Sequence, residues 1–156
     1  MQFGFDTNPR AEALKTRTVE FALRIVGFSR ELRKTWEGQE FSDQIFRAGT
    51  QVGANYRAAC RARSHDEFVA KLGHVVEEAD ESVFWLELIA AAKATCDPAL
   101  PTLIHEANEL SAIFNQSPFT ARMNQRSRTA QSKGRQLNRP FQSTNPNNPK
   151  FKSPNS

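Results

Sequence analysis

The sequence has few of the residues that mark a secreted, membrane-spanning or metal-binding protein. It contains two cysteines, Cys60 and Cys96, which are too few for a disulfide framework and lack the spacing of a metal-ligand set. We interpret both as thiols packed in or near a helical core. No apolar run approaches the roughly 18 residues of a membrane span, and residues 1–15 lack the apolar segment of a signal peptide. These absences predict a cytoplasmic protein that makes no membrane contact.

Acidic residues are missing from the C-terminal part of the chain. Residues 121–156 carry 8 Lys and Arg and no Asp or Glu, whereas residues 1–120 carry 13 Lys and Arg against 17 Asp and Glu. The overall net charge of +4 therefore comes from the tail alone. The tail also has too few apolar side chains to offset the entropy cost of ordering its backbone. We predict a folded domain over residues 8–117 and a disordered basic tail over residues 118–156.

Strand-like alternation is absent from the first 117 residues, and helical periodicity is present instead. The first segment follows Asn8-Pro9, a suitable N-cap and first helical residue, and its apolar stripe recurs at spacings of three and four. This stripe consists of Leu14, Thr18, Phe21, Ile25, Phe28 and Leu32. A second segment, predicted over about residues 40–62, repeats the spacing with Phe41, Ile45, Ala48, Val52, Asn55 and Ala59.

Two further periodic segments complete the predicted domain. The third begins at Ser64 and Glu67, which have the spacing of a capping box, and carries Phe68, Leu72, Val76, Ala79, Val83, Leu86 and Ala90. After the turn at residues 95–101, the fourth carries Leu103, Ala107, Leu110 and Phe114. Four such stripes with short connections predict an all-α, antiparallel up-down four-helix bundle.

The second segment holds two glycines and one polar residue where a helix would favour alanine and leucine. Gly49 and Gly53 lie one turn apart, and each weakens a helix interior by about 0.5 to 1 kcal/mol relative to Ala. We interpret them as a small surface that lets another helix approach closely, which would support assembly or folding. Asn55 falls on the apolar stripe, where it can fix register through a polar partner. A carboxylate, a backbone group, a residue near Leu72 and another subunit are all candidate partners.

The third segment has a second patterned face beside its apolar stripe. Lys71, Glu78 and Trp85 recur every seven residues, and Val75, Ser82 and Ile89 each follow one of them by four residues. Large apolar side chains mixed with charged ones suit a subunit interface, and a Trp that merely covers the monomer core is the alternative interpretation.

Patterns for catalysis and for metal binding are also lacking. Glu78 and Glu81 lie one turn apart, but the paired Glu-x-x-His motifs of di-iron bundles do not occur. The chain has no nucleophile motif, phosphate-binding loop or dinucleotide fingerprint. We therefore predict a protein that is not an enzyme, with no catalytic residue, no metal, no cofactor and no evident small-molecule substrate. An enzyme that uses Asn55, Glu78 and Glu81 is the least favoured alternative.

Three stretches of the sequence resemble a known family. They are RAGTQVGANYRAA, SHDEFVAKL and EEADESVFWLEL, within a similarity that spans roughly residues 12–117. The chain resembles the bacterial four-helix bundle proteins, also called ribosomal RNA intervening-sequence proteins. The matching positions include Arg47, Gly49, Gly53, Asn55, Tyr56, Lys71, Glu78, Glu81 and Trp85.

This resemblance implies an all-α bundle that assembles into a ring-like homo-oligomer, typically a pentamer, with no established biochemical activity. The chain also looks like a distant relative of the accessory bundles of diversity-generating retroelements, which are basic and bind nucleic acid. The bundle of this chain differs in being net acidic, so positive charge is concentrated in the tail.

Two functional hypotheses follow from the sequence. In the first, an oligomeric bundle contacts RNA or single-stranded DNA through its tail, where Phe119 and Phe141 flank a set of basic residues and can stack on bases. These basic residues are Arg122, Arg126, Arg128, Lys133, Arg135 and Arg139. In the second, the bundle is a protein-protein interaction scaffold that binds no nucleic acid. Salt-dependent binding to nucleic acid distinguishes the two hypotheses.

Overall fold

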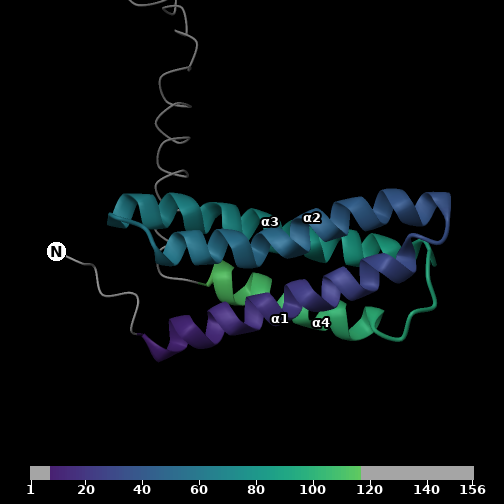
Figure 1. Cartoon of the computed structure of the whole chain (residues 1–156), viewed down its shortest axis with the longest axis horizontal. Helices are drawn as coiled ribbons and strands as arrows, with labels where there is room; N and C mark the ends of the chain where they lie inside the picture. Colours follow the sequence, from purple (N-terminus) through teal and green to yellow (C-terminus); the bar gives the residue numbers. More distant parts are fainter. Residues whose placement is uncertain (1–7, 117–156) are drawn as a thin grey trace, which may run out of the picture. The chain divides into compact units, whose positions relative to one another are not determined.

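The computed structural model describes residues 8–116, which form four consecutive α-helices without a strand among them (Figure 1). The helices are α1 (Pro9–Leu32), α2 (Trp36–Cys60), α3 (His65–Ala91) and α4 (Leu100–Asn115). Helix α1 contacts α2 and α4, and helix α3 also contacts α2 and α4. The predicted all-α four-helix fold is confirmed. The predicted tail at residues 118–156 lies outside the described residues.

Side chains that cap helix ends explain where the first three helices begin. The Asn8 carboxamide and the Thr35 hydroxyl each accept a backbone N–H bond from the first turn of the helix that follows. At α3, the Ser64 hydroxyl accepts from the Glu67 N–H at 3.1 Å, and the Glu67 carboxylate accepts from the Arg63 N–H at 2.8 Å. This hydrogen bond to Arg63 holds the pKa of Glu67 below its ordinary value. The pairing of Ser64 with Glu67 confirms the predicted helix start.

Two helices begin earlier than the periodicity predicts. Helix α2 starts at Trp36 rather than near Glu40, because the Thr35 cap supports a first turn that faces solvent on most sides and therefore shows no apolar period. Helix α4 starts at Leu100, inside the predicted turn, because Pro101 falls in the first turn, where its missing N–H has no intrahelical partner to lose.

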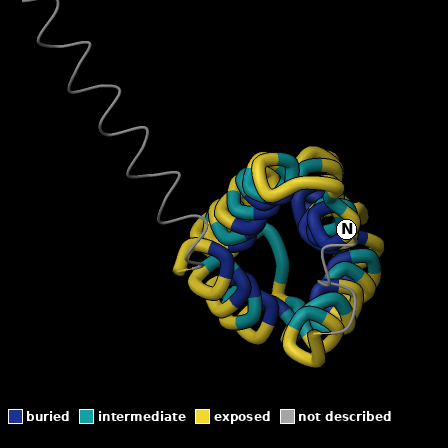
Figure 2. The backbone as a smooth tube through the Cα atoms, turned by 90° about the vertical axis from the view of Figure 1, so that its left-hand side faces the viewer, coloured by how far each residue is buried: buried dark blue, intermediate teal, exposed yellow. Residues whose placement is uncertain are grey.

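The core lies along the common axis of the four helices, and each helix turns its buried side toward it (Figure 2). In α1 and α4 the predicted stripes are buried apart from half-buried Leu14. In α3 the prediction is partly wrong. Val75, Ser82 and Ile89 are fully buried rather than part of a second face, while Ala90 is exposed. The buried sector of α3 is wide because this helix packs against both α2 and α4.

Polar contacts between helices join the bundle at its sides. The Arg17 guanidinium on α1 donates to both carboxylate oxygens of Glu106 on α4, at 2.6 and 3.0 Å. Because this bidentate hydrogen bond favours the charged guanidinium, it raises the pKa of Arg17 despite partial burial. On the other side of α4, Ser111 and Asn115 donate to the Asp80 carboxylate of α3, at 2.6 and 3.1 Å.

Candidate functional site: the outer seam of α2 and α3

The two glycines of α2 face α1 of the same chain. A Cβ atom added at Gly49 would lie 2.8 Å from Cγ1 of Ile25, and one added at Gly53 would lie 3.3 Å from the Thr18 carbonyl oxygen. The predicted close approach of a second helix is therefore confirmed. It occurs within the bundle, however, so this surface is already covered by α1 and offers no free face to another subunit.

Tyr56 is a core residue in the structure. Its side chain is buried, and its ring lies 5.3 Å from the ring of Phe114 on α4, measured between centroids. Burial raises the pKa of the Tyr56 phenol, and the neighbouring Cys60 thiol adds to this effect. Tyr56 thus joins α2 to α4 through packing rather than presenting its hydroxyl to solvent.

Aromatic residues gather where α2 and α3 meet on the outside of the bundle. The half-buried Trp85 ring packs on Phe41 of α2 at 6.5 Å and edge-on against Phe84 at 5.1 Å, measured between centroids. The Trp85 indole N–H donates to the Glu81 carboxylate at 3.0 Å. Phe84 remains 55% exposed. Trp85 therefore covers the core at this position, and Phe84 extends the aromatic surface into solvent.

The antiparallel register of α2 and α3 brings most of the predicted signature residues to one line. The contact between Phe41 and Trp85 fixes this register, and the charge of Arg47 on α2 acts on Glu78 of α3. Continuing the register toward the connecting loop places Asn55 level with Lys71. We call this line the outer seam. It consists of Phe41, Arg47, Asn55, Lys71, Glu78, Glu81, Phe84 and Trp85.

Glu78 is the electrostatically strained member of the outer seam. Its side chain is half-buried, and burial raises the pKa of its carboxyl above the ordinary value. The neighbouring Glu81 and Glu77 raise it further, while His74 and, to a smaller extent, Arg47 oppose the shift. The ionised form of Glu78 is therefore incompletely compensated, and an added cation at this position would stabilise it.

The remaining polar residues of the outer seam differ in their partners. Lys71 forms an ion pair with Glu67 at 3.6 Å, one turn away on the same helix. Asn55 is half-buried, and within residues 8–116 its side-chain amide makes no hydrogen bond. A partner for Asn55 on another subunit stays a prediction.

Arrangements typical of metal centres and membrane spans are not found in the described residues. In residues 8–116 no three His, Cys, Asp or Glu side chains gather as metal ligands would. None of the four helices is both long and apolar enough to cross a bilayer. Cys60 is buried and Cys96 is exposed, and neither forms a disulfide within the described residues. The basic residues proposed for nucleic-acid contact, Arg122 through Arg139, lie outside the described residues.

The helical periodicity of the sequence could not identify several large apolar side chains that are exposed in the structure. Leu23 is 66% exposed, Phe46 is 46% exposed and Trp36 is 80% exposed. Each lies off the apolar stripe of its helix, so the periodicity could only assign it to the solvent side. A count of large apolar residues on those solvent sides would have found them.

Comparison with known proteins identifies the fold's relatives. The sequence model of a family described as 23S rRNA-intervening sequence protein matches residues 13–116. A protein of unknown function from the S23 ribosomal protein family of Bacteroides thetaiotaomicron VPI-5482 has a similar crystal structure. The two chains are 32% identical, with a TM-score of 0.60 over 65% of this chain and 94% of that one. No curated protein matches. The chain therefore belongs to the 23S rRNA-intervening sequence protein family.

Proposed function

We propose that this chain is a non-enzymatic, cytoplasmic assembly protein. Its bundle associates with further copies through the outer seam, and its basic tail contacts RNA or single-stranded DNA. The observation that carries the assembly is the aromatic surface of Phe84 and Trp85 next to the incompletely compensated carboxylate of Glu78. Such a combination of exposed aromatic area and unbalanced charge suits an interface whose partner supplies apolar contacts and a cation.

A ring of copies requires two different surfaces on each chain. In a pentamer each contact is head-to-tail, so the outer seam supplies one surface and another part of the neighbouring copy supplies the second. Asn55 would gain its hydrogen-bond partner in this contact. Because several tails would then converge on one particle, weak phosphate contacts would add through their effective concentration.

The nucleic-acid part of the proposal rests on charge distribution and on the family. The bundle is net acidic, and the acid-free tail carries the positive charge that a phosphate backbone attracts. The description of the family to which the chain belongs, 23S rRNA-intervening sequence protein, refers to an RNA. An RNA contact through the tail is consistent with both observations.

The tail contact is tested with the full-length chain and a labelled single-stranded RNA of about 20 nucleotides. We expect fluorescence anisotropy to show binding at about 50 mM salt that weakens steeply toward 200 mM. Replacing the six basic tail residues from Arg122 to Arg139 by Gln should abolish binding. Replacing Arg57 and Arg61 by Gln, two exposed arginines of the bundle, is the matched control and should leave binding nearly unchanged.

Two results would contradict the tail contact. One is full-length protein that retains no RNA or single-stranded DNA at low salt. The other is a tail variant that binds as tightly as the parent chain. The first result would favour the second function, a protein-protein interaction scaffold, for which the exposed aromatic surface of the outer seam is the supporting observation. The second result would place RNA binding outside the six basic tail residues.

A further inference from the structure

The outward side of α1 carries a line of residues that combines exposed apolar area with positive charge. Leu23, Gly27 and Arg30 recur at spacings of four and three, and Lys34 follows four residues later, in the turn after α1. Leu23 is 66% exposed, and a Cβ atom added at Gly27 would meet nothing within 4 Å. Lys34 pairs with Glu31, but the exposed Arg30 forms no ion pair or hydrogen bond within the described part of the chain. We call these four residues, Leu23, Gly27, Arg30 and Lys34, the α1 stripe.

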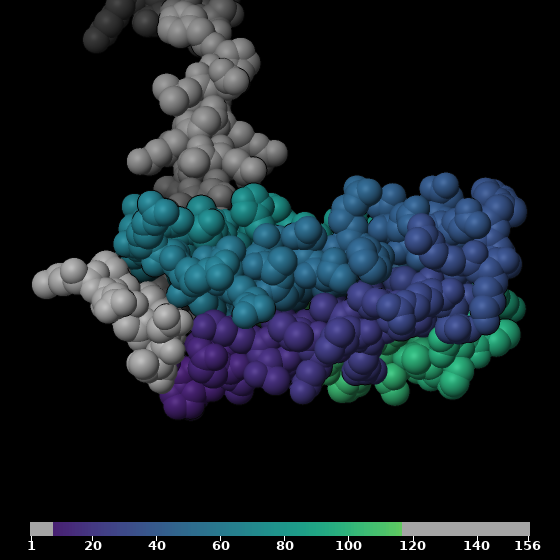
Figure 3. Space-filling view, viewed as in Figure 1, coloured from purple at the N-terminus to yellow at the C-terminus, as the bar shows by residue number. Residues whose placement is uncertain are grey.

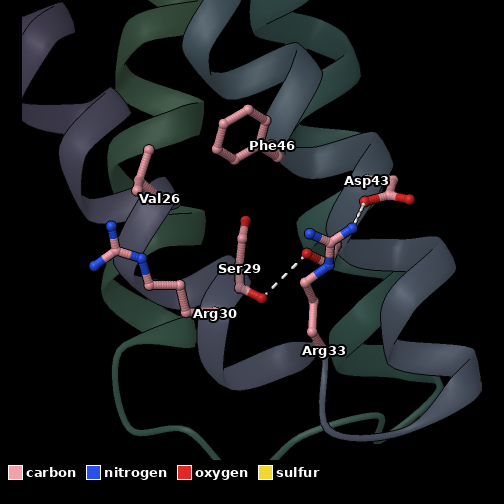
Figure 4. Close-up of a pocket in the computed structure, with 7 residues that line it drawn as sticks. Val26, Ser29, Arg30, Arg33, Asp43 and Phe46 are labelled. Atoms are coloured by element: carbon pink, nitrogen blue, oxygen red, sulfur yellow. Dashed lines mark hydrogen bonds and ion pairs between the residues drawn. The ribbon is translucent and has the colours of Figure 1, made fainter.

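A cleft of about 470 Å³ opens beside the α1 stripe, between the C-terminal half of α1 and the N-terminal half of α2 (Figure 4). These two helices lie side by side on the face of the bundle shown in Figure 3. Val26 and the half-exposed Phe46 line one end of the cleft, and the ion pair of Arg33 with Asp43 lines the other, with the buried Ser29 between them. The end beside Val26 is therefore an apolar hollow next to the α1 stripe.

The outward side of α3 carries a line of residues with the same spacing and the opposite charge. Glu77, Glu81, Phe84 and Leu88 recur at spacings of four, three and four. Phe84 is 55% exposed and Leu88 is partly exposed. No Lys or Arg pairs with Glu77 or Glu81 within residues 8–116. We call these four residues the α3 stripe, which shares Glu81 and Phe84 with the outer seam.

The two helices that carry these stripes differ in charge along their whole length. Residues 9–34 carry 7 Lys and Arg against 3 Asp and Glu, whereas residues 65–91 carry 1 Lys against 7 Asp and Glu. Within one bundle, α1 and α3 each contact α2 and α4 but do not contact each other. The basic helix and the acidic helix of one chain therefore cannot pair, and each can attract the opposite helix of a further copy.

We propose that the α1 stripe of one copy docks on the α3 stripe of the next copy. When the two helices run antiparallel, their equal spacings of four, three and four align the stripes over their whole length, because both helices rise by about 1.5 Å per residue. Phe84 then lies level with Gly27, and its ring enters the apolar hollow beside Val26. The other pairs that meet are Leu23 with Leu88, Arg30 with Glu81, and Lys34 with Glu77.

This contact supplies the second surface that a head-to-tail assembly requires. The inference rests on the proposed assembly through the outer seam, because Glu81 and Phe84 belong to both. A second copy fits the α1 stripe better than an RNA backbone does. Phosphate groups would satisfy Arg30 but leave Leu23 exposed to water, whereas the α3 stripe covers both.

The one acidic residue that continues the α1 stripe also meets opposite charge in this alignment. Glu20 precedes Leu23 by three residues and is exposed. It lies level with Ala91, close to the exposed Lys93, which is the only Lys or Arg in residues 72–116. The alignment thus places the single cation of this part of the chain near the single carboxylate of the stripe's extension.

Charge reversal in the full-length protein tests the pairing of Arg30 with Glu81, and sedimentation equilibrium measures the association. Arg30→Glu and Glu81→Arg should each raise the dissociation constant about tenfold or more, because each places like charges opposite one another. The double variant restores opposite charges and should return the dissociation constant to within about threefold of the parent value. Arg57→Glu, which reverses an exposed arginine elsewhere on α2, is the matched control and should leave the association unchanged.

A second variant tests the apolar part of the contact without changing charge. Leu23→Gln should weaken association several-fold, because it removes exposed apolar area that the α3 stripe would cover. The bundle should stay folded, as measured by circular dichroism, because Leu23 is 66% exposed and contributes little to the core.

The possible results separate this inference from the proposed assembly. A parent chain that stays monomeric would overturn both. A parent chain that Phe84→Glu dissociates, but that keeps its dissociation constant in Arg30→Glu and Leu23→Gln, would overturn this inference and leave assembly through the outer seam standing. A double variant that associates no more tightly than the single variants would overturn the pairing. Arg30→Glu that weakens RNA binding without weakening association would show an RNA surface instead, and it would overturn the inference as well.

Discussion

Alanine substitutions of the glycines test the packing of α1 on α2, because the space around each glycine differs. Gly27 is exposed, and a Cβ atom added there meets nothing within 4 Å. Gly27→Ala should therefore stabilise the bundle by about 0.5 to 1 kcal/mol through helix propensity alone. Gly49→Ala receives the same gain, but its Cβ would lie 2.8, 3.0 and 3.2 Å from three side-chain atoms of the fully buried Ile25.

Ile25 cannot move away easily, because it is β-branched and surrounded by core. Overpacking of this kind costs about 1 to 3 kcal/mol, so Gly49→Ala should destabilise the bundle by about 1 to 2 kcal/mol net. At Gly53 the atom nearest to an added Cβ is the Thr18 carbonyl oxygen at 3.3 Å, so only a small displacement is required. The free-energy cost of this displacement should roughly cancel the gain from helix propensity. At Gly38 the added Cβ would lie 2.0 Å from the Leu32 carbonyl oxygen, so Gly38→Ala should be the most destabilising of the four.

Urea unfolding followed by far-ultraviolet circular dichroism measures these differences, with all variants compared at one protein concentration because self-association adds to apparent stability. The expected order of stability is Gly27→Ala above the parent, Gly53→Ala near it, then Gly49→Ala, then Gly38→Ala. If Gly49→Ala were as stabilising as Gly27→Ala, the reasoning that α1 and α2 approach closely at Ile25 would be wrong.

Three further predictions concern charge and burial. The pKa of Glu78 is raised in the folded state, so the protonated carboxyl favours the folded bundle. This contribution to stability is fully present below the ordinary glutamate pKa and is lost as pH rises through the pKa of the folded state. Glu78→Gln, which stays neutral, should therefore stabilise the bundle relative to the parent chain at pH 7 but not at pH 4. Urea unfolding at the two pH values checks this, and an equal effect at both would contradict it. Arg17→Gln should destabilise the bundle by about 1 kcal/mol and Glu106→Gln by a similar amount, with the double variant less than additive in the same assay, because the two side chains bond to each other at a partly buried site. Ser29→Ala should raise the midpoint of urea unfolding, since a buried hydroxyl without a partner costs about 1 to 3 kcal/mol; a lower midpoint would show that Ser29 makes a stabilising bond.

The fold was predictable from sequence because its main determinants are local. The spacing of three and four residues placed Phe21, Ile25 and Leu103 in the core, and the Ser64 cap placed the start of α3. The start of α2 was not predictable in this way. Its first turn is held by the Thr35 cap and contributes little to the core, so it leaves no apolar period to detect.

The candidate site was only partly predictable. The seven-residue repeat of Lys71, Glu78 and Trp85 correctly indicated a shared line on α3, but the residues between them proved to be core because α3 packs against two helices at once. The glycines correctly indicated a close helix contact, but periodicity cannot say which helix makes it. The cleft beside Ser29 was not predictable, because it depends on which side chains of α1 and α2 meet in space.

Sedimentation equilibrium of the full-length protein at about 10 µM tests whether copies of the chain associate through the outer seam. We expect a particle of five times the 17.6 kDa chain mass, which Phe84→Glu dissociates. Ile113→Glu, which places the same charge on an exposed apolar position of α4, is the control and should leave the particle intact. A parent chain that sediments as a monomer, or a Phe84→Glu variant that retains the parent mass, would contradict assembly through the outer seam.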